Sequence, residues 1–408
     1  MQRHRLAPLT LVLLLAASAC GEATQAVTTS TAAPVPTEPG SAPAPPQPVE
    51  VPQIASSPVE DVPSAIDSMT DIGFPPPLVV PAEIVSGGPP PDGIPPIDAP
   101  LFEHADAVDW LTAEEPVLTI TIENEARAYP IQIMTWHEIV NDTIGTIPVT
   151  ISYCPLCNSA VAYDRRLGHR ILDFGTSGML YNSSLVMYDR QTESLWTHFN
   201  GEAVVGFLTG EVLDTFPVAT VSFADFVAAN PEGIVLSRDT GYDRDYGRNP
   251  YLEYDDPDGD PFLFTGDRDD RLRPQTRVVA IRGATETIVI QQEPLIEAGV
   301  KRTTIDGTAL TAFGAPGTTS ALDAARIPDG KDVGATGVFE SELDGQLLTF
   351  SRTASDRWTD EETTSQWNIF GVAVAGPLKG SQLTRIEHLN TFWFAIAAFD
   401  PDTLIVDG

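Results

Sequence analysis

The apolar residues beyond about position 108 come in short runs that are separated by turn-forming residues. The runs at 117–122 and 277–281 are rich in valine and isoleucine, which is typical of strands. Further pairs of runs meet at Leu167-Gly168 and at Asp344-Gly345, and each pair predicts a β-hairpin. The pattern therefore predicts an α+β domain that is rich in β-structure.

These elements occur twice in the same order. Segments 189–210 and 360–380 share the pattern D-x-x-T-x-S-x-W-x-x-F-G-x-A-V-x-G-x-L-x-G once one residue is deleted. Each is followed by an apolar-faced segment with a Ser or Thr near its start and a proline at its end, which predicts a short helix. We therefore expect an internally duplicated domain of two similar mixed halves, each with β-hairpins and a short C-terminal helix.

Composition divides the chain into five parts. Residues 1–20 resemble a lipoprotein signal peptide, and residues 21–97 are so rich in Pro, Ala and Thr that they predict a disordered tether. The first repeat half is expected at 98–250, an acidic connecting loop at 251–275 and the second half at 276–408.

The N-terminus has the pattern of an export signal. A short basic region precedes the apolar run 6–17, which is too short for a stable membrane span. Small residues before Cys20 resemble a bacterial lipobox, so we expect lipidation of Cys20 and attachment to the extracytoplasmic face of the cell membrane. Ordinary cleavage after Ala19, which would leave Cys20 free, is the alternative.

The charge of the chain excludes some partners. Its 57 acidic and 23 basic residues give a net charge of −34. Such a surface argues against binding to nucleic acid or to anionic lipid head groups. We therefore expect contact with the membrane through the lipid on Cys20, and we predict no particular protein or small-molecule partner.

The two halves differ at chemically informative positions. Cys154 and Cys157 occur in the first half, and the sequence places Gly314 and Gly317 opposite them in the second. His137 and His198 also have no histidine counterpart. Residues that both halves share are expected to form a turn and a core anchor: Asp189 and Asp360, Thr192 and Thr363, Ser194 and Ser365, and Trp196 and Trp367.

The pair Cys154 and Cys157 fits three kinds of site. It could be a redox dithiol, part of a metal site, or a disulfide or pair of buried thiols. The metal site fits the local pattern best, because Pro155 tightens the turn and Asn158 can take the left-handed conformation that closes a metal-binding knuckle. Redox chemistry fits less well, because a predicted strand follows where redox folds use a helix to lower the pKa of the first thiol.

A metal bound by two thiolates needs further ligands. His137, which has Glu138 and Asp142 nearby, and His198 are the candidates. Two cysteines with two histidines suit zinc, and cysteine with histidine can also hold copper or iron, so the metal is left open. Met179 and Met187 are expected in the core.

Two loops are also notable. The Gly- and Tyr-rich segment 241–251 could cover the site, bind a ligand by stacking, or simply link the halves. The acidic run 255–270 suggests calcium but lacks the glycine position of an EF-hand, so we expect a solvated loop.

Several motifs resemble those of a known family. They are W-H-E-x-V-N-D, Y-C-P-L-C-x-S, F-G-x-S-G-x-L-Y-N-S, M-Y-D-R-x-T-x-S-x-W and T-x-W-F-A-x-x-x-F-x-P-D-T, at 136–142, 153–159, 174–184, 187–196 and 391–403. The chain resembles, over about 100–408, the bacterial and archaeal domain-of-unknown-function family numbered thirty-one seventy-nine. The resemblance implies export or association with the cell envelope and no particular activity.

Together these patterns predict an extracytoplasmic lipoprotein that binds a transition metal for redox chemistry or metal handling. Its expected ligands are Cys154, Cys157, His137 and His198. Two alternatives stay open: a thiol–disulfide oxidoreductase that uses Cys154 and Cys157, and a non-catalytic envelope scaffold or binding module.

Overall fold

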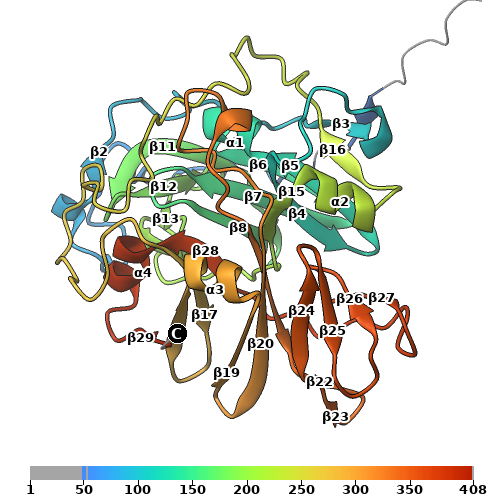
Figure 1. Ribbon diagram of the computed structural model, residues 1–408. Coiled ribbons are helices and arrows are strands. Elements are labelled where there is room, and N and C mark those ends of the chain that lie inside the picture. Colours follow the sequence, from blue (N-terminus) through green and yellow to red (C-terminus); the bar gives the residue numbers. More distant parts are fainter. Residues whose placement is uncertain (1–47, 52–53, 407–408) are drawn as a thin grey trace, which may run out of the picture. The chain divides into compact units, whose positions relative to one another are not determined.

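The fold is described from a computed structural model, which places residues 48–51 and 54–406. The expected signal peptide, Cys20 and the first part of the expected tether lie outside the described residues. Within the described part of the chain the structure is rich in β-strands and has four short α-helices (Figure 1). None of the described helices is long and apolar enough to cross a membrane.

Up to residue 250 the chain forms strands that are interrupted by short helices. The elements are β1 (Val49–Glu50), a 3-10 helix (Pro81–Glu83), β2 (Val85–Ser86), β3 (Leu101–His104), a 3-10 helix (Ala105–Ala107), β4 (Pro116–Ile122), β5 (Glu125–Pro130), α1 (Ile131–His137), β6 (Ile139–Ile144), β7 (Ile147–Cys154), β8 (Ser159–Asp164), β9 (Arg166–Leu167), β10 (Arg170–Ile171), β11 (Phe174–Tyr181), β12 (Ser184–Asp189), β13 (Leu195–Thr197), β14 (Glu202–Val205), β15 (Ala219–Ser222), α2 (Phe223–Ala229) and β16 (Ile234–Leu236). They build sheets in the orders β1-β3-β16-β5-β4-β15, β6-β7-β8 and β14-β13-β12-β11-β2, and a small β9–β10 hairpin.

The rest of the chain repeats much of this order. Its elements are β17 (Arg277–Arg282), β18 (Thr287–Gln291), α3 (Gln292–Ala298), β19 (Val300–Ile305), β20 (Thr308–Ala315), a 3-10 helix (Ile327–Asp329), β21 (Ala335–Glu340), β22 (Glu342–Leu343), β23 (Gln346–Leu347), β24 (Phe350–Ala354), β25 (Arg357–Asp360), β26 (Gln366–Trp367), β27 (Ala373–Ala375), β28 (Leu389–Phe392), α4 (Trp393–Phe399) and β29 (Leu404–Ile405). The sheets have the orders β28-β17-β18-β29, β19-β20-β21 and β24-β25-β26-β27, with a β22–β23 hairpin.

The helices agree only in part with the sequence pattern. Helices α2 and α4 lie where short helices were predicted, whereas α1 and α3 were not predicted. In α1 all residues but Trp136 are buried, so its sequence Ile-Gln-Ile-Met-Thr-Trp-His lacks a polar face. A short run of this kind cannot be distinguished from a buried strand by periodicity.

Parts of the chain on either side of the acidic loop pack directly against each other. Strands β8 and β28 lie side by side (Figure 1). The carbonyl oxygen of Cys157 accepts hydrogen bonds from the backbone N–H of Phe392 at 3.0 Å and from Thr391 Oγ1 at 2.8 Å. Cys154 and Cys157 share an apolar cluster with Phe392 and Trp393. The turn that carries the cysteines is therefore supported by a strand more than 200 residues away.

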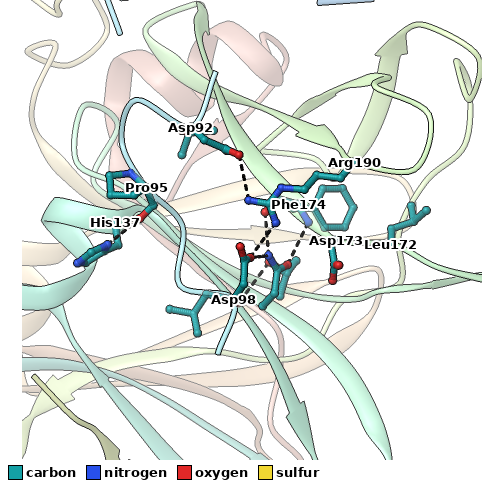
Figure 2. Close-up of polar contacts among 12 residues, drawn as sticks. Asp92, Pro95, Asp98, His137, Leu172, Asp173, Phe174 and Arg190 are labelled. Carbon is teal, nitrogen blue, oxygen red and sulfur yellow. Dashed lines mark hydrogen bonds and ion pairs between the residues drawn. The ribbon is translucent and has the colours of Figure 1, made fainter. Parts of the chain in front are cut away.

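The described part of the expected tether lies on the domain, which differs from the disordered segment predicted at 21–97. Ala65 and Ile84 are buried in an apolar cluster with residues of β12–β14. Closer to the domain, Arg190 forms ion pairs with Asp92 at 3.1 Å and with Asp98 at 2.8 Å (Figure 2). A proline-rich segment cannot build a core of its own, but its few apolar residues can be buried on a surface that other strands provide.

A buried aspartate organises the same turn on both sides of the acidic loop. Asp189 Oδ2 accepts a hydrogen bond from Trp196 Nε1 at 2.9 Å, and Asp360 Oδ2 accepts one from Trp367 Nε1 at 2.9 Å. Each carboxylate also accepts a hydrogen bond from the threonine three residues later. Both indole rings are fully buried. These shared residues form a turn and a core anchor, as the sequence predicted.

We expect Asp189→Ala and Asp360→Ala each to lower the free energy of unfolding by about 2–3 kcal/mol, because each leaves a buried indole N–H and the backbone N–H of a threonine without their acceptor. Urea denaturation measures the change. The exposed Asp243 provides a control, and Asp243→Ala should stay within about 0.5 kcal/mol of the wild type. A buried variant that unfolds like this control would contradict the role of the carboxylate.

Candidate functional site

The two cysteines lie on a tight turn between two strands. Cys154, the last residue of β7, pairs with Ser159, the first residue of β8. Asn158 has a φ of 50°, the left-handed conformation that the sequence predicted for the end of this turn. Its side-chain oxygen also accepts a hydrogen bond from Tyr153 Oη at 3.1 Å. The turn directs both cysteines inward, so that they are 1% and 0% exposed, and both are free thiols.

The two thiols have different surroundings. Cys157 Sγ lies 2.9 Å from Ser159 Oγ and 3.5 Å from Ser184 Oγ, whereas Cys154 Sγ accepts a hydrogen bond from the N–H of Leu185 at 3.4 Å. Burial raises the pKa of the Cys154 thiol. Burial also acts to raise the pKa of Cys157, but hydrogen bonds from Cys154, Ser159 and Ser184 outweigh it and lower the pKa. Cys157 is therefore the thiol that ionises first.

A chain of hydrogen bonds connects Cys157 to His198. The Ser152 hydroxyl donates to the Glu138 carbonyl oxygen at 3.1 Å, so its own oxygen can accept the Nδ1–H of His198 at 2.9 Å. His198 Nε2 is then unprotonated and accepts the hydroxyl of Ser159 at 2.9 Å. The Ser159 oxygen is left to accept the S–H of Cys157. With Cys157 protonated, the chain begins at the thiol. When Cys157 is ionised, the hydroxyls of Ser159 and Ser184 can instead donate to its sulfur, and these are the bonds that lower its pKa.

His198 is held as a neutral ring. His198 follows β13 and is fully buried. Its backbone N–H donates to the carbonyl oxygen of Leu185 at 3.0 Å. Burial lowers the pKa of His198 to about 3. The structure therefore brings His198 to the cysteines, as the sequence predicted, but with Ser159 between its ring and the nearer sulfur.

His137 belongs to a different group of contacts. Its Nδ1 lies 2.6 Å from the carbonyl oxygen of Pro95, as Figure 2 shows, and its Nε2 lies 2.6 Å from the hydroxyl of Tyr246. Burial lowers the pKa of His137 to about 4. Both ring nitrogens are used, so neither is available for a metal shared with the thiols. His137 instead fixes the segment 92–98 on the domain.

The described residues contain no group of three or more His, Cys, Asp and Glu side chains that could hold a metal ion. The structure thus brings together Cys154 and Cys157, with His198 one hydroxyl away, and leaves His137 out. Met187 packs in the apolar cluster of the cysteines, and Met179 packs in a neighbouring one.

The sequence indicated Glu138 only as a carboxylate beside His137, whereas the structure places it beside the cysteines. It ends α1 with φ 59° and ψ −28°, a left-handed conformation that costs a non-glycine residue about 1 kcal/mol. Helix α3 ends in nearly the same conformation, φ 80° and ψ −23°, at Gly299. Glycine, which adopts this conformation without strain, thus ends α3, whereas a strained glutamate ends α1. Backbone strain of this kind is often found at functional sites.

The carboxyl group of Glu138 is buried close to the cysteines. It is 6% exposed, and the hydroxyl of Tyr251 donates to its Oε1 at 3.4 Å. Burial, with a smaller contribution from the negative charge of an ionised Cys154, raises the pKa of Glu138 to about 8. At neutral pH this carboxyl group is therefore mostly protonated and can donate a hydrogen bond.

A cavity of about 520 Å³ lies against Glu138 and the cysteine turn. Leu156, between the two cysteines, and Leu185, whose N–H reaches Cys154, both line it. Tyr251 and Tyr254 from the loop that follows the first half also contribute to its wall. Of the Gly- and Tyr-rich segment 241–251, the last two residues, Pro250 and Tyr251, line this cavity.

The matching turn after β20 does not carry the glycine replacements that the sequence predicted. Val300 pairs with Phe313 as Ile139 pairs with Ser152, which places Ala315, not Gly314, at the position of Cys154. Ala315 pairs with Ala335, so a long loop, 316–334, replaces the short turn. The predicted alignment was therefore wrong at these positions, because it assumed turns of equal length.

We expect Glu138→Gly to raise the free energy of unfolding by about 1 kcal/mol, because glycine adopts the left-handed conformation without strain. The matched control, Gly299→Ala, should lower it, because a Cβ there would lie 2.6 Å from Arg352 Nε. Thermal or urea unfolding measures both. A destabilised Glu138→Gly protein would show that the carboxyl group is needed for packing.

Comparison with known proteins supports the resemblance seen in the sequence motifs. The family model described as "Protein of unknown function (DUF3179)" matches residues 91–403, which is most of the chain. No curated protein and no solved structure matches. The protein therefore belongs to the DUF3179 family.

Proposed function

We propose that Cys154 and Cys157 form a redox-active dithiol in which Cys157 is the reactive thiol. The observation that carries this proposal is the hydrogen-bond chain from Cys157 through Ser159 to Nε2 of His198. A thiol is activated when hydrogen bonds to its thiolate lower its pKa. When Cys157 ionises, the hydroxyls of Ser159 and Ser184 can donate to its thiolate. His198, which stays neutral because burial lowers its pKa to about 3, contacts Ser159 and keeps that hydroxyl in place.

The exchange of two electrons needs both cysteines. The thiolate of Cys157 would attack one sulfur of a disulfide substrate, and the other substrate sulfur would leave as a thiolate and take up the proton. Cys154, once deprotonated, would then attack Sγ of Cys157 and release the second substrate thiol. One substrate disulfide is reduced and one Cys154–Cys157 disulfide is formed. Because both thiols are buried, a small substrate that enters through the cavity fits better than a protein surface.

We also propose that the chain arose by duplication of one unit. Support comes from the order of elements, since β4-β5-α1-β6-β7-β8 is followed later by β17-β18-α3-β19-β20-β21. Further support comes from equal contacts, such as the edge-to-face packing of Phe174 on Trp196 and of Phe350 on Trp367 at 5.7 and 5.6 Å. The second half would then be a structural copy without the thiols, and its β28 would hold the cysteine turn in place.

For the location we propose an extracytoplasmic lipoprotein. The basis is the sequence alone: an apolar run behind a basic N-terminus and small residues before Cys20. A secreted location suits a dithiol that alternates with a disulfide, because disulfides persist outside the cytoplasm.

A soft transition-metal ion bound by the two thiolates is the second candidate function. It is favoured by the adjacent free thiols and by the absence of a third ligand in the described residues. Zinc sites almost always have four ligands, whereas soft thiolates select monovalent copper. This proposal therefore narrows the metal to Cu⁺ and the ligands to Cys154 and Cys157.

For the redox proposal we expect Cys157 to be alkylated at lower pH than Cys154. Ser159→Ala should raise the pKa of Cys157 by about one unit, which leaves about tenfold less thiolate at neutral pH. Iodoacetamide labelling of the reduced protein across the pH range of thiol ionisation, read by peptide mass spectrometry, measures this.

Ser183→Ala is the matched control, since the structure shows no hydrogen bond from the buried Ser183 hydroxyl to Cys154 or Cys157. His198→Gln should slow labelling of Cys157 as Ser159→Ala does. If neither variant changes the pH profile of Cys157, the hydrogen-bond chain does not activate it.

For the metal proposal we expect the reduced protein to take up one Cu⁺ per chain in competition with a chelator. Cys154→Ser and Cys157→Ser should each abolish uptake, because one thiolate is not enough. His137→Gln should leave uptake unchanged, since that ring is used elsewhere. Loss of uptake in His137→Gln would restore the ligand set predicted from the sequence.

A further inference from the structure

The cavity beside the cysteines has an unusual chemical composition. Among the described residues, its lining includes no Lys, Arg or His, and Glu138 is the one residue there with a carboxyl group. Most of the remaining wall is apolar, including Ile94, Leu156, Met179 and Leu185. Cavities with an apolar wall and a few placed polar groups are typical of small-molecule sites, in which the polar group fixes the orientation of the ligand.

The cavity has an apolar approach from solvent. Leu252 and Phe262 both line it, and they are 56% and 48% exposed. Large apolar side chains that stand exposed together often mark a binding site. A charged ligand would have to leave water and pass these side chains without a counter-ion in the wall. The approach therefore favours an uncharged molecule.

One wall of the cavity is held in place by polar contacts behind it. Ile94 lies in the segment that Arg190 fixes through Asp92 and Asp98 and that His137 fixes through Pro95 (Figure 2). This wall comes from the proline-rich segment before the domain. It is also joined to the wall that the strands form, because the backbone N–H of Asp92 donates to the carbonyl oxygen of Thr176 at 2.8 Å and Thr176 Oγ1 donates to the carbonyl oxygen of Ile94 at 2.7 Å. The described structure thus closes a cavity that the strands alone would leave open on one side.

Glu138 supplies the directional contact. Among the described side chains, Tyr251 is the one that hydrogen-bonds its carboxyl group, and that bond is long at 3.4 Å. The described residues of the wall include no positively charged side chain that would hold the group as a carboxylate. A buried carboxyl group without a cation prefers its uncharged form, which offers an O–H. The carboxyl group is present despite the backbone strain at Glu138, whereas α3 ends in Gly299 and has no carboxyl group there.

We propose that this cavity binds an uncharged, mainly apolar small molecule whose carbonyl-type oxygen accepts a hydrogen bond from Glu138 beside Cys154. Binding of such a molecule does not depend on thiol chemistry. That it is also the molecule that reacts with the thiols rests on the proposed function.

Three probes of equal shape test the ligand class: 2-acetylnaphthalene, 2-ethylnaphthalene and 1-(2-naphthyl)ethylamine. The ketone carries an acceptor oxygen, the hydrocarbon carries no polar group, and the amine carries a positive charge. On the full chain, calorimetry or fluorescence titration should show that the ketone binds about tenfold tighter than the hydrocarbon, as one hydrogen bond in an apolar site provides. Tightest binding of the amine, or no binding of any probe, would overturn the proposal.

Variants show whether Glu138 and this cavity are responsible. Glu138→Leu should remove the preference for the ketone over the hydrocarbon, and Glu138→Gln, which keeps a donor, should retain most of it. Met179→Trp should fill the cavity and weaken the binding of all probes. If Met179→Trp leaves binding unchanged, the probes bind elsewhere and the proposal fails.

The double variant Cys154→Ser/Cys157→Ser separates this proposal from the proposed function. It should bind the ketone as the wild type does. Ketone binding in both proteins without any redox activity of the wild type would remove the thiol function and leave the ligand site. Redox activity of the wild type without a preference for the ketone would remove the ligand site and leave the thiol function.

Discussion

The site depends on the two hydrogen bonds that the carbonyl oxygen of Cys157 accepts from Thr391 and Phe392. The turn of four residues between β7 and β8 has hydrogen bonds of its own, such as the one from Tyr153 to Asn158, and it is also held from outside. Strand β28 provides these contacts from a distant part of the sequence. The positions of both sulfur atoms, and with them the contact between Cys157 and Ser159, thus depend on the part of the chain that has no thiols.

This constraint gives the second half a physical role. Its sheets resemble those of the first half in order, but its turn after β20 is replaced by a long loop and its helix α3 ends in glycine. Trp393 and Phe392 enter the apolar cluster that buries the cysteines. The part of the chain after the acidic loop thus contributes packing and hydrogen bonds to the cysteine turn, and the part before it contributes both cysteines.

Much of the fold could be predicted from the sequence because its signals are local. Hairpins, the turn around Asp189 and the bend at Asn158 depend on residues a few positions apart. The partners of His137 could not be predicted, because Pro95 and Tyr246 lie 42 and 109 residues away. Ser159 and Ser184 were missed as partners of Cys157, since a serine in a strand has no distinctive pattern. The available signal for Glu138 was that a glutamate follows the run 131–137, whereas a glycine follows the matching run 292–298.

The left-handed backbone at Glu138 has a consequence for the history of such proteins. Folding alone favours glycine there, as Gly299 illustrates. In a descendant that no longer used the carboxyl group, selection would not retain the glutamate. Its replacement by glycine would then raise the free energy of unfolding. Retention of an acidic residue at this position therefore records continuing selection for use, and its replacement by glycine would identify a lineage that has abandoned the site.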